Sequence, residues 1–427
     1  MFQTLPRNPK WLPTLTTSLR KLISSRPTSV GRAAYTLLAA SLLQAYPEKG
    51  PNELFSDRSQ IFFQKDSESK PFSYLFINLL LIDLRSSFPS LLSKLNSAEY
   101  QDISQRLSAA FDIISSFIGF LVRRLDEDDD INSSDSKMPP DLLLKLRKDL
   151  SETMSLTIEY LRDRWDSSIA GASGLHPDAR IGTAATSEGT RLTLTWESMK
   201  DNVTEDPLTL AGIRALAMWI HEDENKNLRT ESAGLMDMFI ELYKSSSTGA
   251  VDFRYPILLA LEGILDTEDG VDGLLSHGGW EVLSADLDTI LHTLKDIVPG
   301  ASISTSAARG LEVVRVVLAV VDHSSITYPK EDWMNTITTT AALKAPSNSS
   351  LPIVIELHIA MLQLSTALLS KAAGGMQKRY VTTNPALFGL RNQLHAVTER
   401  MDDKEEAAEF VSLLEDVQLG LENLRFS

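Results

Sequence analysis

The most constraining feature of this 427-residue sequence is an apolar period of three to four residues that recurs in segment after segment. One segment places apolar side chains at Ile213, Leu216, Ala217 and Ile220, and another at Leu235, Met238, Phe239 and Leu242. Side chains at this spacing share one face of an α-helix, and that face must be buried. Alternating runs are nearly absent, and the best one, Arg191–Thr195, adjoins a segment that fits a helix equally well. We therefore predict an all-α fold.

Expected helix starts recur at regular intervals in the second half of the sequence. Cap-type residues and prolines open four apolar segments, at Asp206-Pro207, Tyr255-Pro256, Ser304-Thr305 and Leu351-Pro352. Pro207, Pro256, Thr305 and Pro352 are separated by 49, 49 and 47 residues. Armadillo and HEAT arrays use similar periods, with two or three helices in each repeat. The spacing predicts an armadillo/HEAT-like α-solenoid of stacked helix pairs.

Two segments without apolar periodicity divide the sequence. One is acidic, and the other is rich in Gly, Ala, Ser and Thr, so both are expected to be mobile surface loops. The predicted organisation is N-terminal helical repeats at 1–125, an acidic loop at 126–140, a connecting helix at 141–166, a flexible loop at 167–190, and C-terminal helical repeats at 191–427 with a capping helix.

The charge of the chain limits its partners. The net charge is −16, and phosphate binding needs a clustered excess of Lys and Arg, so nucleic acid is excluded as a partner. Residues 1–125 carry 15 Lys and Arg against 9 Asp and Glu, which gives +6. The remaining residues carry 26 against 48, which gives −22. We expect a protein partner with a neutral or basic surface, steered by the acidic C-terminal part.

Cysteine usage and hydropathy bear on the compartment. The sequence has no cysteine, which excludes disulfides and thiolate metal sites and is compatible with a reducing compartment. The longest apolar runs, Leu75–Leu84 and Leu311–Val321, are short for a spanning helix and include charged residues. Both runs are predicted to be buried core helices, and no transmembrane segment is expected.

The N-terminal segment admits two interpretations. Residues 1–47 contain six basic residues, no acidic residue and many Ser and Thr, which is typical of a mitochondrial transit peptide. Prolines at positions 6, 9 and 13 interrupt that pattern, and an apolar stripe follows at Leu12, Leu15, Leu19 and Leu22. We expect the first helices of the array here, in a cytoplasmic protein, and keep mitochondrial import as the alternative.

Catalytic and metal-binding templates do not fit the sequence. His221-Glu222 begins a zincin-like pattern, but Asn225 stands where the second histidine belongs. The acidic segment 266–273 has Val271 where a calcium loop needs glycine. There is no GxxxxGK[ST], GxGxxG or GxSxG motif. We predict no catalytic residue, cofactor or metal. The enzyme alternative is an all-α metal site drawn from distant helices, such as Glu262, Glu356 and His358, although it lacks the Glu-x-x-His spacing of di-iron bundles.

A few aromatic and charged residues are candidates for a protein-binding surface. In Ser276–Trp280, two glycines allow close backbone approach and a Trp supplies a large anchor, although an interhelical turn with a packed Trp is the favoured interpretation. The candidate positions, chosen without knowledge of which face is concave, are Trp219, His221, Glu222, Asp223, Arg229, His277 and Trp280.

Two segments resemble the neurochondrin family. In Leu210–Tyr243 a leucine-rich helix ends in acidic residues before a second amphipathic helix, and in Tyr255–Leu291 a turn with the pattern "dG...Ll..gGw" opens the next repeat. Compared with that family, the chain is expected to be short at its N-terminus. The resemblance implies an armadillo-like α-solenoid, a cytoplasmic location, and a role as a protein-binding adaptor or regulator in signalling and trafficking. It implies no catalytic residues.

Overall fold

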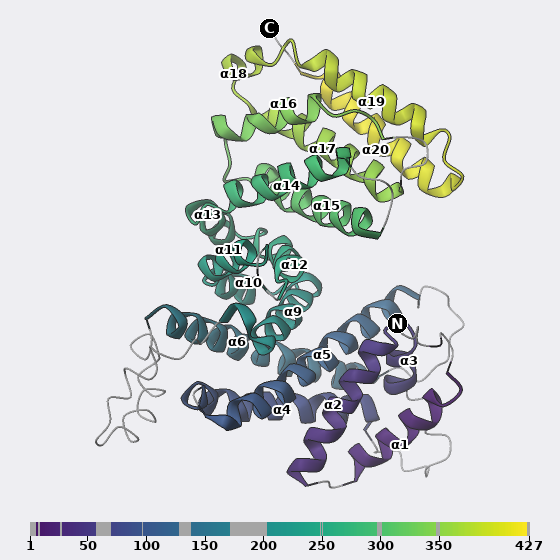
Figure 1. Cartoon of the computed structure of the whole chain (residues 1–427), viewed down its shortest axis with the longest axis vertical. Coiled ribbons are helices and arrows are strands. Elements are labelled where there is room, and N and C mark those ends of the chain that lie inside the picture. The colour runs from purple at the N-terminus through teal and green to yellow at the C-terminus, as the bar shows by residue number, and fades with distance from the viewer. Residues whose placement is uncertain are drawn as a thin grey trace. The chain divides into compact units, whose positions relative to one another are not determined.

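Figure 1 shows the computed structural model of the chain, in which every regular element of the described residues is a helix. The described residues are 6, 9–25, 28–56, 70–95, 97–127, 138–170, 203–247, 249, 251–296, 301–346 and 351–424. The prediction of an all-α fold is confirmed for these residues. The chain forms two compact units, Met1–Ala260 and Leu261–Ser427, whose boundary falls within helix α12 (Arg254–Ile264).

The first unit is built from helices that pack in pairs. Helix α5 packs against both α2 and α9, and α4 packs against α6. From first to last, the elements of this unit before α12 are α1 (Leu12–Ser24), α2 (Ser29–Ala45), α3 (Gly50–Phe55), α4 (Phe72–Leu91), η2 (Leu92–Lys94), α5 (Ala98–Glu127), α6 (Pro140–Ala170), η4 (Val203–Glu205), α9 (Pro207–Glu222), α10 (Lys226–Ala233) and α11 (Met236–Ser245).

The second unit follows the same packing rule. Helix α15 packs against both α14 and α17, and α20 packs against both α17 and α19. Its elements after α12 are α13 (Glu268–Ser276), α14 (Gly279–Asp296), α15 (Ala301–Asp322), η5 (Glu331–Met334), α16 (Asn335–Ala341), α17 (Pro352–Lys371), α18 (Gly374–Arg379), α19 (Asn384–Thr398) and α20 (Lys404–Glu422).

Side-chain caps explain where several helices begin. The first N–H groups of a helix have no partner within the helix, so a preceding Asp, Asn or Thr can accept from them. Asp206 accepts from the Leu208 amide at 3.0 Å ahead of α9, and Pro207 occupies the first turn. Asn225 caps α10, Thr267 caps α13 and Asp403 caps α20 in the same way.

The expected helix starts are only partly those of the structure. Helices α9 and α17 begin at Pro207 and Pro352, as the sequence indicated, and Pro256 lies in the first turn of α12. Thr305 was wrongly assigned to a helix start, because α15 begins at Ala301. Ser304 and Thr305 lie inside this helix and do not cap it. The four helices α9, α12, α15 and α17 begin at residues 207, 254, 301 and 352, which are 47, 47 and 51 residues apart.

A polar cluster lies within the otherwise apolar core of the first unit. Arg164 and Asp206, whose side chains are 2% and 5% exposed, form an ion pair at 3.4 Å. The Tyr100 hydroxyl donates to Asp206 Oδ2 at 2.6 Å and lies 3.3 Å from the Tyr160 hydroxyl. Burial, followed by the charge of Asp206, raises the pKa of Tyr100, and burial raises that of Tyr160. Both phenols therefore remain protonated, which allows Tyr100 to satisfy the buried carboxylate.

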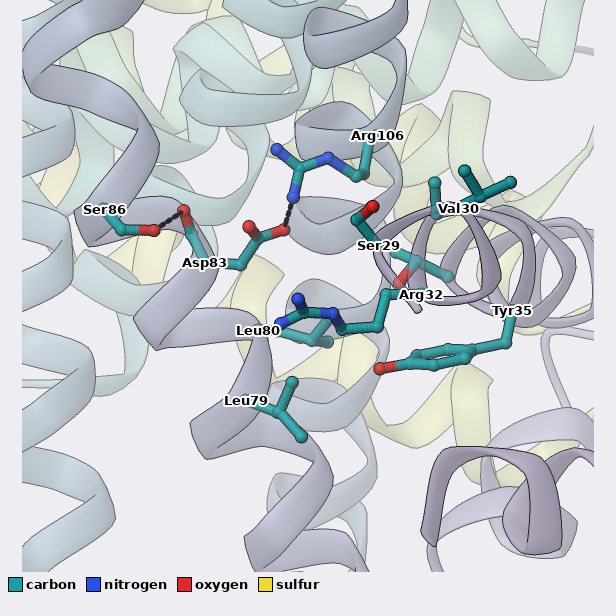
Figure 2. A pocket seen from close by; sticks show the side chains of 11 residues that line it. Ser29, Val30, Arg32, Tyr35, Leu79, Leu80, Asp83, Ser86 and Arg106 are labelled. Atoms are coloured by element: carbon teal, nitrogen blue, oxygen red, sulfur yellow. Dashed lines mark hydrogen bonds and ion pairs between the residues drawn. The ribbon is translucent and has the colours of Figure 1, made fainter. Parts of the chain in front are cut away.

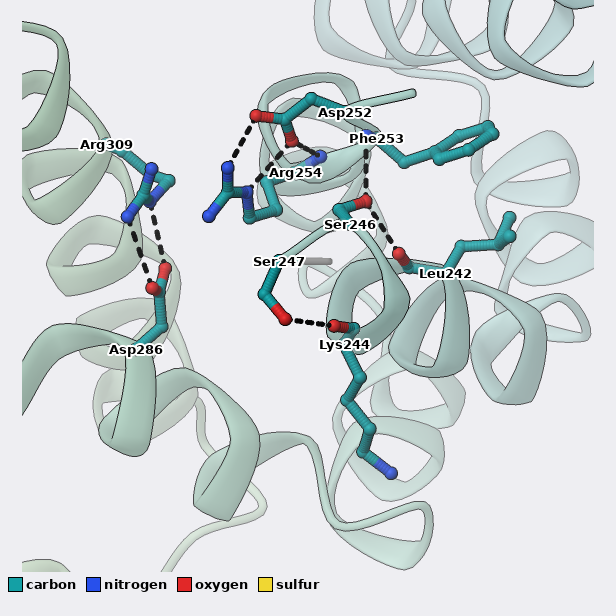
Figure 3. A network of polar contacts seen from close by, with 9 residues as sticks. All are labelled: Leu242, Lys244, Ser246, Ser247, Asp252, Phe253, Arg254, Asp286 and Arg309. Carbon is teal, nitrogen blue, oxygen red and sulfur yellow. Dashed lines mark hydrogen bonds and ion pairs between the residues drawn. The ribbon is translucent and has the colours of Figure 1, made fainter. Parts of the chain in front are cut away.

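The connection between α11 and α12 shows how a short turn satisfies its backbone (Figure 3). The Ser246 hydroxyl accepts from the Phe253 amide at 2.9 Å and donates to the Leu242 carbonyl at 2.7 Å. Phe253 is fully buried, so this serine holds the entrance of α12 close to the end of α11. In the second unit, Arg309 of α15 pairs with Asp286 of α14 through bonds of 3.0 and 3.2 Å.

Two apolar stripes predicted from the sequence differ from the structure. In α1, Leu12 and Leu19 are buried as expected, but Ile23 faces the core and Leu22 is 55% exposed. In the last turn, the buried residue is therefore the one four positions after Leu19, and not the one three positions after it. In α4 the predicted fully buried run also exposes Leu75 and Ile82, at 49% and 64%. The second long run, in α15, is buried along most of its length, from Val313 to Val321.

Three helical segments are long and apolar enough to cross a membrane by length and composition alone. They are Phe72–Lys94, Glu99–Arg124 and Pro352–Lys371, and 44%, 56% and 67% of their most apolar windows are buried inside the protein. The expectation that no segment spans a membrane therefore stays a prediction.

The predicted domain divisions lie partly outside the described residues. Most of the acidic loop and nearly all of the flexible loop belong to segments 128–137 and 171–202, of which the structure says nothing. Between them, α6 covers the expected connecting helix. The two compact units are divided at residue 260, away from both loops. The organisation inferred from the loops stays a prediction.

Candidate functional site

A cleft opens between α2 and α4 in the first unit, with α5 contributing to its lining (Figure 2). Its volume is about 490 Å³. Helix α2 places Ser29, Arg32, Ala33 and Thr36 along it at a spacing of three to four residues, with Val30 and Tyr35 at the edges of that face. Helix α4 supplies Leu79, Leu80, Asp83 and Ser86, and α5 supplies Arg106. The cleft therefore combines apolar walls with a few charged groups, which is the usual character of a binding site.

The acidic group of the cleft is already paired. Arg106 Nη1 donates to Asp83 Oδ2, and the two side chains are 22% and 29% exposed. Arg106 Nη2 also lies 3.4 Å from the Ser87 hydroxyl, and the Ser86 hydroxyl donates to the Asp83 carbonyl at 3.0 Å. The pair fixes α5 against α4 and cancels the charge of Asp83 locally.

The second arginine of the cleft has no such partner. Among the described residues, no carboxylate lies within ion-pair distance of the exposed Arg32, which extends from α2 towards Leu80 and Asp83 (Figure 2). Burial raises the pKa of the neighbouring Tyr35 phenol, the charge of Arg32 lowers it, and Asp83 raises it. Within the described part of the chain, the cleft thus carries one positive charge without an ion-pair partner, beside a protonated phenol.

Exposed apolar side chains occur on both helices that form the cleft. Val30 of α2 is 78% exposed, and Leu75 and Ile82 of α4 are 49% and 64% exposed. Leu75, Leu79 and Ile82 are spaced by four and three residues and lie on one face of α4. The sequence carried a signal for this face, because Leu75–Leu84 is apolar at every position except Asn78 and Asp83, and a helix that is not covered on all sides must expose part of such a run.

Three of the sequence-predicted positions in the first unit are largely buried, and their proposed role in binding stays a prediction. Trp219 is 7% exposed, and its Nε1 has no hydrogen-bond partner among the described residues. Asp223, 5% exposed, accepts from Arg147 at 2.5 and 3.1 Å. Arg229 is buried and donates from Nη2 to the Ile220 carbonyl at 3.2 Å. These residues connect α9 with α6 and α10.

The exposed pair at the end of α9 differs from its neighbours. The His221 and Glu222 side chains are 47% and 36% exposed, and His221 Nδ1 lies 3.0 Å from Glu222 Oε1. These two positions are available to a partner, and their proposed role in binding stays a prediction.

The remaining two predicted positions belong to the second unit. His277 follows α13 and is exposed, whereas Trp280, in the first turn of α14, is 3% exposed. Gly278, at φ +69°, provides the turn between these helices. Trp280 stacks on Trp333 with ring centroids 4.1 Å apart. The segment is thus an interhelical turn with a packed Trp.

Residues of the suggested metal site have other contacts. Glu356 pairs with Arg315 at 3.3 Å, and His358 Nδ1 contacts the Val354 carbonyl at 2.7 Å. In the part of the chain that the structure describes, no three His, Asp or Glu side chains gather as metal ligands would. The carboxylates therefore do not outline a metal centre there.

Because every regular element of the described residues is a helix, the fold defines an all-helical protein. The neurochondrin family model matches residues 1–370, so the chain belongs to the neurochondrin family. This confirms the resemblance drawn from Leu210–Tyr243 and Tyr255–Leu291.

Similar proteins include an uncharacterized protein of Schizosaccharomyces pombe, 21% identical over 216 residues. The match covers 50% of this chain and 33% of that protein, so the chain matches only about a third of its relative's length. Among solved structures, the crystal structure of SYS-1 is similar at a TM-score of 0.34 and 11% identity, covering 98% of this chain and 80% of that one.

Proposed function

We propose that this chain is a non-catalytic scaffold that binds a partner protein on the surface of an armadillo-like array of stacked helix pairs. Membership of the neurochondrin family and the 47-to-51-residue recurrence of helix starts support the array. The observation that carries the binding function is the α2–α4 cleft, whose helices expose apolar side chains and present Arg32, a cation without an ion-pair partner among the described residues.

Surface exposure of this kind has an energetic consequence. Each Å² of apolar surface that leaves water contributes about 25 cal/mol, so a partner that covers Val30, Leu75 and Ile82 gains affinity from contacts that the free chain leaves unmade. Buried Trp219 and Trp280 cannot contribute such contacts without rearrangement. We therefore place the binding surface at the cleft in addition to the exposed His221, Glu222 and His277.

The non-catalytic assignment rests on the residues themselves. Burial raises the pKa of the Tyr100 and Tyr160 phenols, and these side chains form a polar cluster with Asp206 and Arg164 inside the core. General acid–base catalysis requires a perturbed group that reaches a substrate, and these groups are buried away from the cleft lining. We propose a cytoplasmic location and a partner whose basic surface is steered by the acidic residues 126–427.

Affinity purification of the tagged chain from its native cells, followed by quantitative mass spectrometry, tests the proposal. The wild type is compared with a Leu75→Asp, Ile82→Asp variant and with Leu419→Asp, a control whose side chain is 58% exposed on α20. We expect one protein at stoichiometric amounts with the wild type and the control, and its loss with the cleft variant. A folded cleft variant that retains every partner would contradict the proposed surface, and a bound metabolite with turnover would contradict the non-catalytic assignment.

A further inference from the structure

The exposed face of α4 has the spacing of a helix-binding surface. Leu75, Leu79 and Ile82 occupy positions i, i+4 and i+7, and the distance from first to last along the axis is about 10 Å. This length matches two turns of a partner helix that presents apolar residues at i, i+3, i+4 and i+7. Val30, across the cleft on α2, gives the surface a second apolar border. Leu79 belongs both to this face and to the cleft lining, so the face adjoins the α2–α4 cleft, and the two together are called the groove below.

The charge beside the groove distinguishes among partner helices. Asp83 is neutralised by Arg106, and the nearby Arg85 pairs with Asp149 and Glu152 at 3.5 and 3.3 Å. Arg32 has no carboxylate partner among the described residues, and its guanidinium lies at the edge of the cleft. Residues 1–125 as a whole carry +6. A carboxylate on the partner gains a charge-assisted hydrogen bond here, whereas a lysine is repelled.

We propose that the α2–α4 cleft binds an acidic amphipathic helix of a partner protein. Apolar residues of that helix cover Leu75, Leu79 and Ile82, and an Asp or Glu beside them pairs with Arg32. The inference rests on the proposed function and specifies its partner. The acidic helix of the partner would bind the basic residues 1–125. A basic surface elsewhere on the same partner could still face the acidic residues 126–427.

Other occupants fit the groove less well. A membrane surface is held by clusters of several Lys and Arg, each contributing about 1 kcal/mol near anionic lipid. Of the two arginines that line the cleft, Arg106 is paired with an acidic side chain, which leaves Arg32. A second copy of this chain would bring its own Arg32 towards the same groove in a two-fold arrangement, which places like charges together. An acidic amphipathic helix offers apolar side chains to the exposed face of α4 and a carboxylate to the Arg32 guanidinium.

A displayed peptide library tests the inference with the full-length chain. Peptides of about 16 residues carry leucines at i, i+3, i+4 and i+7, and their flanking positions are randomised among Asp, Glu, Lys, Ser and Ala. Selection uses wild-type protein, Arg32→Glu, the Leu75→Asp, Ile82→Asp variant and the Leu419→Asp control, each checked for wild-type helicity and thermal unfolding. We expect acidic peptides on the wild type and the control, and about tenfold or greater loss of their affinity with Arg32→Glu.

The other results each have a defined meaning. Enrichment of lysine-rich peptides on Arg32→Glu and loss of all peptides on the Leu75→Asp, Ile82→Asp variant support the inference. Enrichment of basic peptides on the wild type, or acidic peptides that bind Arg32→Glu equally well, overturns it. Binding to phosphatidylserine vesicles, or self-association in sedimentation, that depends on Leu75 and Ile82 without any peptide enrichment also overturns it.

The peptide and purification results separate the two claims. A native partner that is lost with the Leu75→Asp, Ile82→Asp variant but retained with Arg32→Glu leaves the scaffold function standing and overturns the acidic-helix inference. A purification in which folded wild-type protein captures nothing that the cleft variant loses contradicts the scaffold surface itself.

Discussion

Trp280 and Trp333 stack almost face to face in the second unit, with ring centroids 4.1 Å apart and planes inclined by 15°. Their exposures are 3% and 1%, and they join the first turn of α14 to the η5 turn. The pair thus connects two successive helical groups of the unit through its core.

Replacing Trp280 by Ala should destabilise the second unit by about 3–5 kcal/mol, because it removes buried aromatic surface and leaves a cavity beside Trp333. Thermal and urea unfolding measure the change. Tyr328→Ala is the control, since Tyr328 is 65% exposed and its loss should change the free energy of unfolding by less than about 0.5 kcal/mol. Equal effects of the two substitutions would contradict a core role for Trp280.

Removal of Asp206 should be costly in the first unit. The Asp206→Ala change removes the buried carboxylate that pairs with Arg164 and also removes the cap of α9, so we expect a loss of about 3–5 kcal/mol. The matched control is Arg379→Ala. Arg379 pairs with Glu331, but both side chains are largely exposed, and loss of that pair should cost at most about 1 kcal/mol. Urea unfolding of both variants provides the comparison.

Replacement of Gly270 and of Gly389 by Ala should change the free energy of unfolding in opposite directions. A Cβ on Gly270 would overlap the Ile264 carbonyl oxygen and lie 2.8 Å from Ile264 Cγ2, so Gly270→Ala should destabilise the second unit by about 1–3 kcal/mol. A Cβ on Gly389, inside α19, meets nothing within 4 Å, and Gly389→Ala should stabilise by about 0.5–1 kcal/mol. Melting temperatures check both signs. A stabilised Gly270→Ala variant would show that α12 and α13 approach each other differently.

Lowering the pH should decrease the free energy of unfolding of the second unit, because His358 is buried there. Burial lowers the pKa of this side chain below its usual value of 6.5, and the hydrogen bond with Val354 opposes the shift. Below about pH 6.5 the unfolded chain binds a proton that folded His358 does not, so stability is lost as pH falls towards the lowered pKa. The loss reaches at most about 1.4 kcal/mol per pH unit.

A His358→Gln variant isolates this contribution. Its free energy of unfolding should fall less than that of the wild type between about pH 7 and pH 5, because Gln does not titrate. The same substitution at the exposed His292 is the control for the exchange of histidine by glutamine. Parallel pH profiles for the wild type and His358→Gln would rule out this linkage.

The sequence predicted the helical class because the apolar period is local. Each helix carries its own pattern and often its own cap, as Asp206 and Pro207 do for α9. The start of α15 was placed wrongly at Thr305, because Ser and Thr favour caps but are also tolerated within a helix. A cap-type residue marks the start of a helix only where no helical segment precedes it.

The candidate site was less predictable, because it depends on which face of each helix is covered. Trp219 and Trp280 are large amphipathic side chains that suit either a binding surface or a core, and tertiary packing placed both in the core. Leu75 and Ile82 belong to an apolar run that fits complete burial, yet the neighbours of α4 leave these two exposed. Arg32 gave no local signal, since its lack of a partner depends on the pairing of Asp83 with Arg106.

Hydrogen–deuterium exchange of the chain, alone and with the protein captured by the wild type but not by the Leu75→Asp, Ile82→Asp variant, tests the central claim most directly. The account predicts slower exchange on binding in peptides that cover residues 29–36 of α2 and 75–86 of α4, and no such protection with the cleft variant. Protection confined to other helices, with unchanged exchange in α2 and α4, would contradict a partner bound in this cleft.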